Sequence, residues 1–174
     1  HLLSKIKGPG VSIVATIVVG ADGSSTISGS SSEVTSAADR ATFLQRRRLV
    51  DCIIIGGNTA RNEPYSKTPV PLVVVSKQEH PQLPSANVWD LDPKDALTRA
   101  RQEFGDNILI EGGASFISYV LEQNLVDVLE LSVTNSTGGA DIFDYKKFLS
   151  LAHSVNKKVV SDTTFYTAEF KTQK

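Results

Sequence analysis

Two short apolar runs of this sequence each end on a pair of glycines, a combination that suits the binding of a phosphate. Cys52–Ile55 runs into Gly56-Gly57, and Ile108–Glu111 runs into Gly112-Gly113. Because glycine has no Cβ, a phosphate can come close to the backbone N–H groups at the start of the following helix. A single glycine pair is more simply a tight turn between a strand and a helix. The repetition favours a cradle for one phosphorylated cofactor.

Acidic and hydroxyl side chains stand beside both glycine pairs. Thr59, Arg61 and Glu63 follow the first pair, while Glu111 and Ser115 flank the second. Such groups could hydrogen-bond a sugar and guide a proton, which is what a hydride-transfer enzyme requires of its protein. The histidines and acids match the spacing of neither a zinc site nor a Ser-His-Asp triad, so we expect no metal centre.

One helix of the sequence carries several arginines. It is predicted over residues 36–50, with the hydroxyl of its first residue as the N-terminal cap. Phe43 and Leu44 mark the face that turns toward the core. Arg40 and Arg47 lie three or four residues from them, on that same face.

Arg47 is therefore expected to point into the protein, and Arg46 to point elsewhere. A buried guanidinium has to be paired with an anion. That anion is either an acid of the protein, such as Asp51, or a phosphate of a ligand, and the spacing alone does not choose between the two.

Composition limits the class of protein. The chain has 174 residues, 40% of them hydrophobic, and a formal net charge of −1. We expect a tail at residues 1–8, where His1 could belong to a tag, and a single domain at residues 9–174. No apolar run approaches the roughly 20 residues of a membrane helix, so a membrane is not an expected partner. The only dense basic run is Arg46–Arg48, so a nucleic acid is not expected either. The single cysteine, Cys52, favours a reducing cytoplasm.

Short apolar strands alternate with helical segments, which predicts an α/β domain whose sheet is covered by helices on both faces. Strands are expected at residues 11–19, 52–55, 72–76, 88–89, 108–111, 129–133, 155–160 and 165–170. Further helices are expected at 93–104, where Asp92 is the cap and Pro93 the first residue, and at 114–123. From Asp127 onward apolar residues alternate with polar ones, so this part is expected to be antiparallel.

Five motifs occur in an order that resembles the reductase domain of bacterial riboflavin biosynthesis. They are Asp22-Gly23, residues 29–35, Arg47, residues 51–63, and residues 110–113 together with 125–127. The resemblance covers about residues 10–145. It implies the fold of dihydrofolate reductase, a three-layer αβα arrangement around a mixed sheet with a parallel centre and an antiparallel C-terminal edge.

Such domains use NADPH to reduce the ribosyl group of 5-amino-6-(5-phosphoribosylamino)uracil to a ribityl chain. The resemblance implies that Arg47 holds this substrate through its phosphate, that Ser31 lies nearby, and that Glu111 binds the sugar hydroxyls. Glu63 is the candidate for handling the accompanying proton. The resemblance also implies a homodimer joined through the C-terminal strands, where Leu129 and its neighbours would supply apolar surface.

The resemblance further implies where NADPH would bind. Thr59 and Glu63 would border the nicotinamide half, residues 113–115 would bind the diphosphate, and Ser76 and Lys77 would contact the 2′-phosphate of the adenosine. The complete set of expected cofactor residues is Gly56, Gly57, Thr59, Glu63, Ser76, Lys77, Gly112, Gly113, Ala114 and Ser115.

The chain departs from the family on the substrate side. Thr16 stands where the family often has a lysine, and the segment Glu63-Pro64-Tyr65 is shorter than its counterpart. Two other functions therefore stay open. One is a pteridine reductase resembling dihydrofolate reductase, and the other is a non-catalytic nucleotide-binding protein, because a fold does not fix a function.

Overall fold

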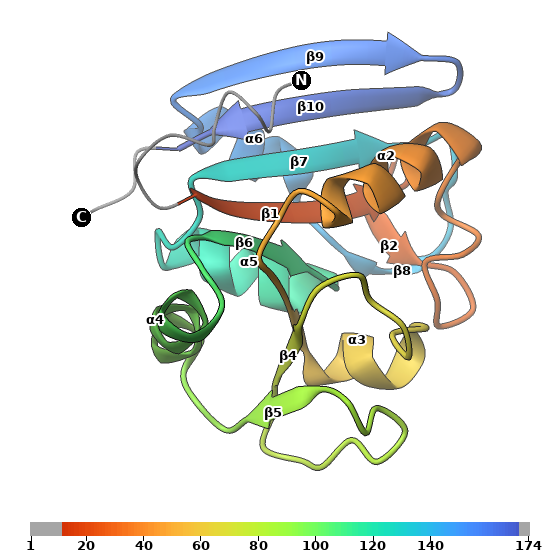
Figure 1. Ribbon diagram of the computed structural model, residues 1–174. Helices are drawn as coiled ribbons and strands as arrows, with labels where there is room; N and C mark the ends of the chain where they lie inside the picture. Colours follow the sequence, from red (N-terminus) through yellow and green to blue (C-terminus); the bar gives the residue numbers. More distant parts are fainter. Residues whose placement is uncertain (1–11, 171–174) are drawn as a thin grey trace.

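A mixed sheet of eight strands runs through the computed structural model, which describes residues 12–170 (Figure 1). The strand order is β5-β4-β3-β6-β1-β7-β10-β9. The strands of this sheet are β1 Ser12–Val19, β3 Cys52–Gly56, β4 Leu72–Val75, β5 Asn87–Trp89, β6 Asn107–Glu111, β7 Val128–Val133, β9 Ser154–Val160 and β10 Thr163–Glu169. Two short strands, β2 Ser24–Thr26 and β8 Ala140–Ile142, pair separately. The helices are α2 Ala37–Arg47, α3 Gly57–Asn62, α4 Pro93–Glu103, α5 Ala114–Glu122 and α6 Tyr145–Leu151.

The centre of the sheet is parallel and its C-terminal edge is antiparallel, as expected. β1, β3, β4, β5, β6 and β7 pair in parallel, whereas β10 is antiparallel to both β7 and β9. The antiparallel part begins later than predicted, because β7 is parallel to β1. The helix α5 connects β6 to β7, and a helical crossover of this kind returns the chain in the same direction.

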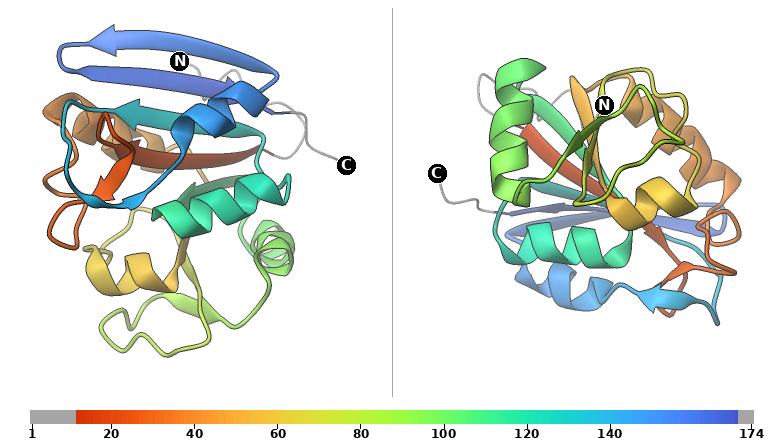
Figure 2. Two further views of the ribbon diagram at one scale, coloured as in Figure 1. Left: turned by 180° about the vertical axis from the view of Figure 1, so that it is seen from behind. Right: turned by 90° about the horizontal axis from the view of Figure 1, so that it is seen from below.

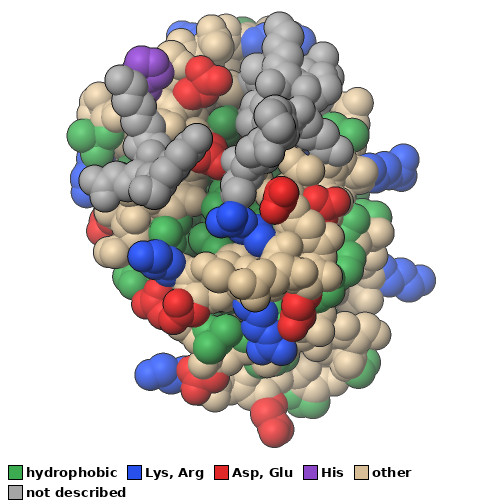
Figure 3. Space-filling view, turned by 60° about the vertical axis from the view of Figure 1, so that its left-hand side comes forward, with side chains coloured by type: hydrophobic (Ala, Val, Ile, Leu, Met, Phe, Trp, Pro, Cys, Tyr) green, Lys and Arg blue, Asp and Glu red, His purple; other side chains and the backbone are tan. Residues whose placement is uncertain are grey.

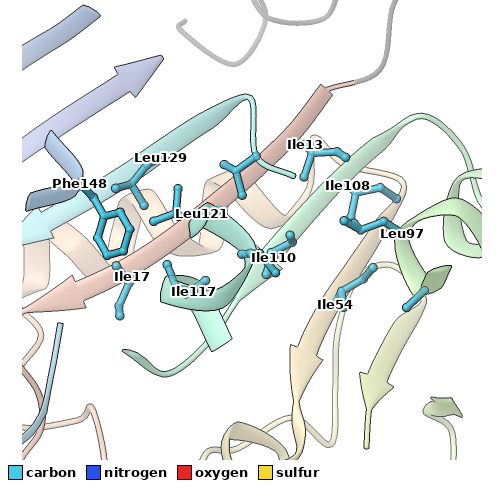
Figure 4. Packing of buried hydrophobic residues seen from close by; sticks show 14 of the residues in the cluster. Ile13, Ile17, Ile54, Leu97, Ile108, Ile110, Ile117, Leu121, Leu129 and Phe148 are labelled. Atoms are coloured by element: carbon cyan, nitrogen blue, oxygen red, sulfur yellow. The ribbon is translucent and has the colours of Figure 1, made fainter. Parts of the chain in front are cut away.

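Two helical layers cover the sheet. The helices α4, α5 and α6 pack on one face, against a cluster that includes Ile17, Ile54 and Ile110 (Figure 4). The helices α2 and α3 lie on the opposite face. In Figure 1, α2 is in front of the sheet. In the left view of Figure 2, which shows the molecule from behind, α5 and α6 are in front of it. The predicted three-layer αβα architecture is therefore confirmed.

Apolar and polar residues alternate along β7, although this strand is parallel to β1 and its apolar side chains are buried. Leu129 and Leu131 are 0% and 1% exposed, because they pack under the helices of the first face. Glu130 and Ser132 point to the opposite face and are buried as well. These leucines are therefore unavailable as an apolar surface for a second subunit.

Local signals at helix ends were predicted correctly, but the inward face of α2 was predicted only in part. The hydroxyl of Ser36 accepts a hydrogen bond from the N–H of Asp39 at 3.1 Å, and Asp92 caps α4 with a proline in the first turn. Leu44, expected to face the core, is 44% exposed, and Arg46, expected to point away, is 4% exposed. The helix ends at Arg47, three residues earlier than predicted.

The expected tail at residues 1–8 lies outside the described residues. Within residues 12–170, none of the helices is both long and apolar enough to cross a membrane. Acidic and basic side chains alternate over the face drawn in Figure 3 instead of gathering in one patch. Cys52 is fully buried as a free thiol, and burial, followed by the charge of Asp51, raises its pKa to about 12.

Candidate active site

A cleft of about 780 Å³ opens beyond the carboxyl ends of β1, β3 and β6. This is the edge at which ligands bind in open α/β sheets. The cleft collects most of the residues predicted from the sequence: Ser31, Arg47, Gly56, Gly57, Thr59, Glu63, Glu111, Gly112, Gly113, Ala114 and Ser115. Both glycine pairs lie on its wall, so the two strand ends contribute to one site. Ser76 and Lys77 lie outside this lining.

The guanidinium of Arg47 and the carboxylate of Glu111 form a bidentate ion pair. Arg47 donates from Nε to Oε2 at 2.9 Å and from Nη2 to Oε1 at 2.8 Å. The partner of Arg47 within the protein is therefore Glu111 and not Asp51, whose Oδ2 accepts the N–H of Asn107 at 2.9 Å. Two residues that were expected to contact the substrate separately thus contact each other.

Tyr65 completes this cluster, and the sequence prediction had given it no role. Its hydroxyl donates to Oε1 of Glu111 at 2.6 Å, and its ring lies 5.0 Å from Cζ of Arg47. Burial, followed by the charge of Glu111, raises the pKa of Tyr65 well above its ordinary value, so the phenol stays protonated. Burial alone would lower the pKa of Arg47, but its hydrogen bonds and charge interaction with Glu111 outweigh burial and raise it.

Arg46 belongs to a second buried polar cluster beneath α2. Its Nη1 donates to Oγ1 of Thr16 at 2.7 Å, and its Nη2 lies 3.9 Å from Oε2 of Glu130. The same Glu130 oxygen accepts from Thr167 at 3.0 Å. Burial lowers the pKa of Arg46. Burial raises the pKa of Glu130, and the positive charge of Arg46 opposes this rise. The side of α2 that packs on the sheet spans a wide arc of the helix surface. Arg46 and Arg47 can therefore both point toward the sheet although they are adjacent in sequence.

A hydrogen bond joins the two glycine turns. The N–H of Gly113 donates to Oγ1 of Thr59 at 3.0 Å, and a Cβ placed on Gly113 would lie 3.7 Å from this oxygen. The helix α5 begins directly after Gly113, and no side chain caps it. The first N–H groups of α5 are therefore available to an anion in the cleft.

Glu63 connects the end of α3 with the loop over the cleft. Its Oε1 accepts the N–H of Ser31 at 2.7 Å, and its Oε2 lies 3.5 Å from Oγ of Ser30. The loop reverses at Ser28 and Gly29, where φ is 53° and 83°. Glu63 and Ser31, both predicted as site residues, are thus brought together by a contact that no local pattern indicated.

Ser76 and Lys77 line a second cavity of about 420 Å³. The hydroxyl of Ser76 accepts the N–H of Gln78 at 3.1 Å and bonds Nε2 of His80 at 2.9 Å. A Cβ placed on Gly57 would lie 3.0 Å from this hydroxyl. The second cavity therefore adjoins the main cleft at the first glycine pair.

Several residues on the wall of the cleft were not identified from the sequence as parts of the site. They are Asp39, Arg40, Phe43, Asn58, Asn62, Tyr65, Phe116, Tyr119 and Asp141. Arg40 and Phe43 had been placed on the correct face of α2, so the helical wheel contained their signal. Tyr65 follows the Glu63-Pro64 dipeptide directly, and its position after a predicted site acid was the only local indication. Among the described residues, no group of three His, Cys, Asp or Glu side chains is arranged to hold a metal ion.

Many solved structures have a similar fold. A Thermotoga maritima protein described as a diaminohydroxyphosphoribosylaminopyrimidine deaminase/5-amino-6-(5-phosphoribosylamino)uracil reductase has a TM-score of 0.73 and 15% identity, over 97% of this chain and 59% of its own. RibD of Acinetobacter baumannii gives 0.65 and 16%, over 92% and 58%. A pyrimidine reductase-like protein of Corynebacterium diphtheriae gives 0.72 and 17%, over 99% and 96%. The chain thus spans less than two thirds of the first two proteins.

A comparison with curated protein sequences found no significant match. A family model does match, namely that of the RibD C-terminal domain, over residues 11–162. This match covers nearly all of the chain, and it agrees with the dihydrofolate reductase-like fold and with the order of the sequence motifs. The chain therefore belongs to the RibD C-terminal domain family, the reductase domain of riboflavin biosynthesis.

Proposed function

We propose that this chain uses NADPH to reduce the ribosyl group of 5-amino-6-(5-phosphoribosylamino)uracil to the ribityl form. One observation carries the proposal. A single cleft has an uncapped helix start behind a glycine pair on one wall and the buried Arg47–Glu111 pair on another. The first wall suits the diphosphate of a dinucleotide and the second suits a polar sugar.

The cofactor side is proposed to use the two glycine turns. The N–H groups of Ala114 and Ser115 fit a diphosphate, because α5 has no side-chain cap and Gly113 leaves room in front of it. Thr59 and Glu63 would border the nicotinamide, while Ser76 and Lys77 in the adjoining cavity would meet the 2′-phosphate of the adenosine. Bound NADPH would supply the hydride, which adds to C1 of the ring-opened, imine-like ribose.

The substrate side is proposed to use Ser31, Arg47 and Glu111. Oε1 of Glu111 already accepts from both Arg47 and Tyr65, but Oε2 accepts only one hydrogen bond from the described residues. A carboxylate oxygen has two lone pairs, so Oε2 can still accept one ribose hydroxyl. Nη1 of Arg47 takes no part in the ion pair and can donate to the substrate.

Glu63 is our candidate for the proton that accompanies hydride transfer, and it would deliver this proton toward the imine nitrogen. Its Oε1 is held by the N–H of Ser31, which fixes the orientation of the carboxyl group. Its other oxygen has only the longer contact with Ser30. A carboxyl group with one anchored oxygen is oriented for proton transfer through the second.

We also propose that the protein is a cytoplasmic homodimer. The strand β9 forms the edge of the sheet, and Val155 and Val159 on it are 42% and 62% exposed. An edge strand with exposed apolar side chains favours pairing with a second copy. The single buried thiol suits a reducing compartment.

One assay separates the candidate functions. NADPH oxidation is followed with 5-amino-6-(5-phosphoribosylamino)uracil and, separately, with dihydrofolate. Turnover of the ribosylaminouracil phosphate alone supports the proposal, whereas turnover of dihydrofolate alone would replace it with a pteridine reductase. If calorimetry detects NADPH binding and neither compound is reduced, the chain is a non-catalytic nucleotide-binding protein.

A further inference from the structure

His80 is a buried imidazole on the wall of the second cavity, and the proposed function gives it no role. Its side chain belongs to a residue that is only 4% exposed. Its Nε2 lies 2.9 Å from Oγ of Ser76, whereas its Nδ1 is buried and has no hydrogen-bond partner among the described residues. A buried ring nitrogen without a partner restricts where the ring can carry its proton.

The two tautomers of the neutral ring would treat Ser76 in opposite ways. With the proton on Nδ1, the ring would bury an N–H that has no acceptor, and Nε2 would accept from the Ser76 hydroxyl. With the proton on Nε2, the ring donates to Oγ of Ser76 and leaves an unused lone pair on Nδ1. Buried backbone N–H groups without an acceptor are rarer in proteins than carbonyl groups with an unused lone pair, and the same preference favours the proton on Nε2.

This tautomer leaves Ser76 with only a proton to offer a ligand. Its Oγ accepts the N–H of Gln78 at 3.1 Å and, from the other side, the N–H of His80. A hydroxyl oxygen has two lone pairs, so both are occupied. Its own proton has no acceptor among the described residues and is free to point toward a ligand.

The hydroxyl of Ser76 is uncovered where the two cavities adjoin. A Cβ placed on Gly57 would lie 3.0 Å from this Oγ, closer than an ordinary contact, so only glycine leaves the oxygen accessible from this side. The charges of the second cavity do not by themselves select a phosphate, because Lys77 lines it together with Glu79 and Asp90. The direction of the Ser76 hydrogen bond therefore bears on which group can bind there.

We infer that His80 is a positioning residue for the choice of dinucleotide: by donating to Oγ of Ser76 it makes this hydroxyl a pure donor, which favours the 2′-phosphate of NADPH over the 2′-hydroxyl of NADH. The identity of the ligand rests on the proposed function. Phosphate oxygens only accept, and a hydrogen bond to a charged acceptor is stronger than one to a neutral oxygen. A ribose hydroxyl at this place must also find an acceptor for its own proton, and Ser76 has no lone pair left to provide one.

The test compares NADPH and NADH affinity by calorimetry. His80→Leu removes the donor, so NADPH affinity should fall about three- to tenfold while NADH affinity stays unchanged. Ser76→Ala should weaken NADPH binding about tenfold, and adding His80→Leu to it should cause no further loss, because His80 acts through Ser76. His80→Gln should stay within about twofold of the wild type, since its amide can donate from near the position of Nε2.

The tautomer can be read directly from long-range ¹H–¹⁵N correlation spectra of the imidazole rings. The chain has three histidines, so the signal lost in His80→Gln identifies that of His80. We expect a proton on Nε2, and a neutral ring protonated on Nδ1 would overturn the inference. Because this measurement is made on the wild-type protein, the inference stays testable even if His80→Leu is unstable.

His153→Leu is the matched control, because it changes an exposed histidine that lines neither cavity and should keep both affinities. Equal losses of NADPH and NADH affinity in His80→Leu would show a packing role instead. An unchanged NADPH affinity in His80→Leu, or a further loss on the Ser76→Ala background, would likewise overturn the inference. Each of these results leaves the proposed function standing, whereas a wild-type protein that does not bind NADPH would overturn both.

Discussion

Arg47 and Glu111 are 64 residues apart in sequence, yet they meet through two nearly parallel hydrogen bonds on the wall of the cleft. Glu111 is 1% exposed and the side chain of Arg47 is 8% exposed, so removing either residue leaves a buried charge without its partner. This pair therefore has a structural role in addition to the one proposed for it in substrate binding. The two roles can be measured separately.

The first prediction concerns the stability of this pair. Arg47→Ala and Glu111→Ala should each lower the free energy of unfolding by about 3–5 kcal/mol, the cost of leaving one member of a buried ion pair uncompensated. The double variant should lose clearly less than the sum, because no isolated charge remains. Denaturant unfolding provides the measurement, and the exposed control Arg48→Ala should change stability by no more than about 0.5 kcal/mol. Additive losses would show that the two residues act independently.

The second prediction concerns the glycine turn before α5. Gly113→Val should abolish NADPH binding, because its side chain would occupy the space in front of the first N–H groups of α5. The fold should survive, since a Cβ there meets Thr59 at an ordinary 3.7 Å. Calorimetry with NADPH and a melting curve on the same sample check both statements. The control Ser118→Ala, further along α5 and outside the cleft, should bind NADPH normally. Normal NADPH binding by folded Gly113→Val would refute a diphosphate site at the start of α5.

The third prediction concerns the choice between NADPH and NADH. Lys77→Gln should weaken NADPH binding by about tenfold and leave NADH binding unchanged, because a single charged contact to the 2′-phosphate is lost. Lys67→Gln removes an exposed lysine that lines neither cavity, so it serves as the control. Equal affinities of the wild-type protein for the two dinucleotides would remove Ser76 and Lys77 from the site.

The fourth prediction concerns assembly through β9. The wild-type protein should sediment as a dimer at micromolar concentration, and Val159→Lys should sediment as a monomer, because a charge would replace the apolar side chain that is 62% exposed on the edge strand. Leu44→Lys places the same charge on an exposed position of α2 and should leave the dimer intact. A monomeric wild-type protein would refute the interface.

The fifth prediction concerns acid sensitivity. The pKa of Asp22 falls from 3.8 to about 2, first through the hydrogen bond from the Ser24 hydroxyl and then through the N–H of Gly138. Because the folded-state pKa lies below the unfolded one, this stabilisation is complete above about pH 4 and is lost as the pH falls through about 2. Asp22→Asn should therefore be less stable than the wild type above pH 4, and the difference should vanish near pH 2. A difference that stays constant across urea unfolding experiments from pH 2 to 6 would contradict this account.

Sequence reasoning succeeded where the cause of a structure is local. The glycine pairs, the Ser36 cap and the Asp92-Pro93 helix start are each decided by neighbouring residues, and all were found in place. Clustering of the two glycine turns was also predictable, because parallel strands end at one edge of a sheet.

The contacts that were missed join distant parts of the chain. Arg46 is buried because Thr16 and Glu130 supply its partners from two strands beneath α2. The hydroxyl of Tyr65 reaches Glu111 across 46 residues. Neither contact has a periodic signal in the sequence, since a helical wheel describes one helix without the surface on which it lies.

The hydrogen bond between Gly113 and Thr59 has a directional consequence for a ligand. Because the oxygen of Thr59 accepts the N–H of Gly113, its single proton is not used in that bond, and no acceptor for it is found among the described residues. The hydroxyl is free to rotate this proton toward the cleft. A ligand oxygen that faces Thr59 can therefore accept this proton, whereas a ligand N–H can bind only at the one lone pair that Gly113 leaves free.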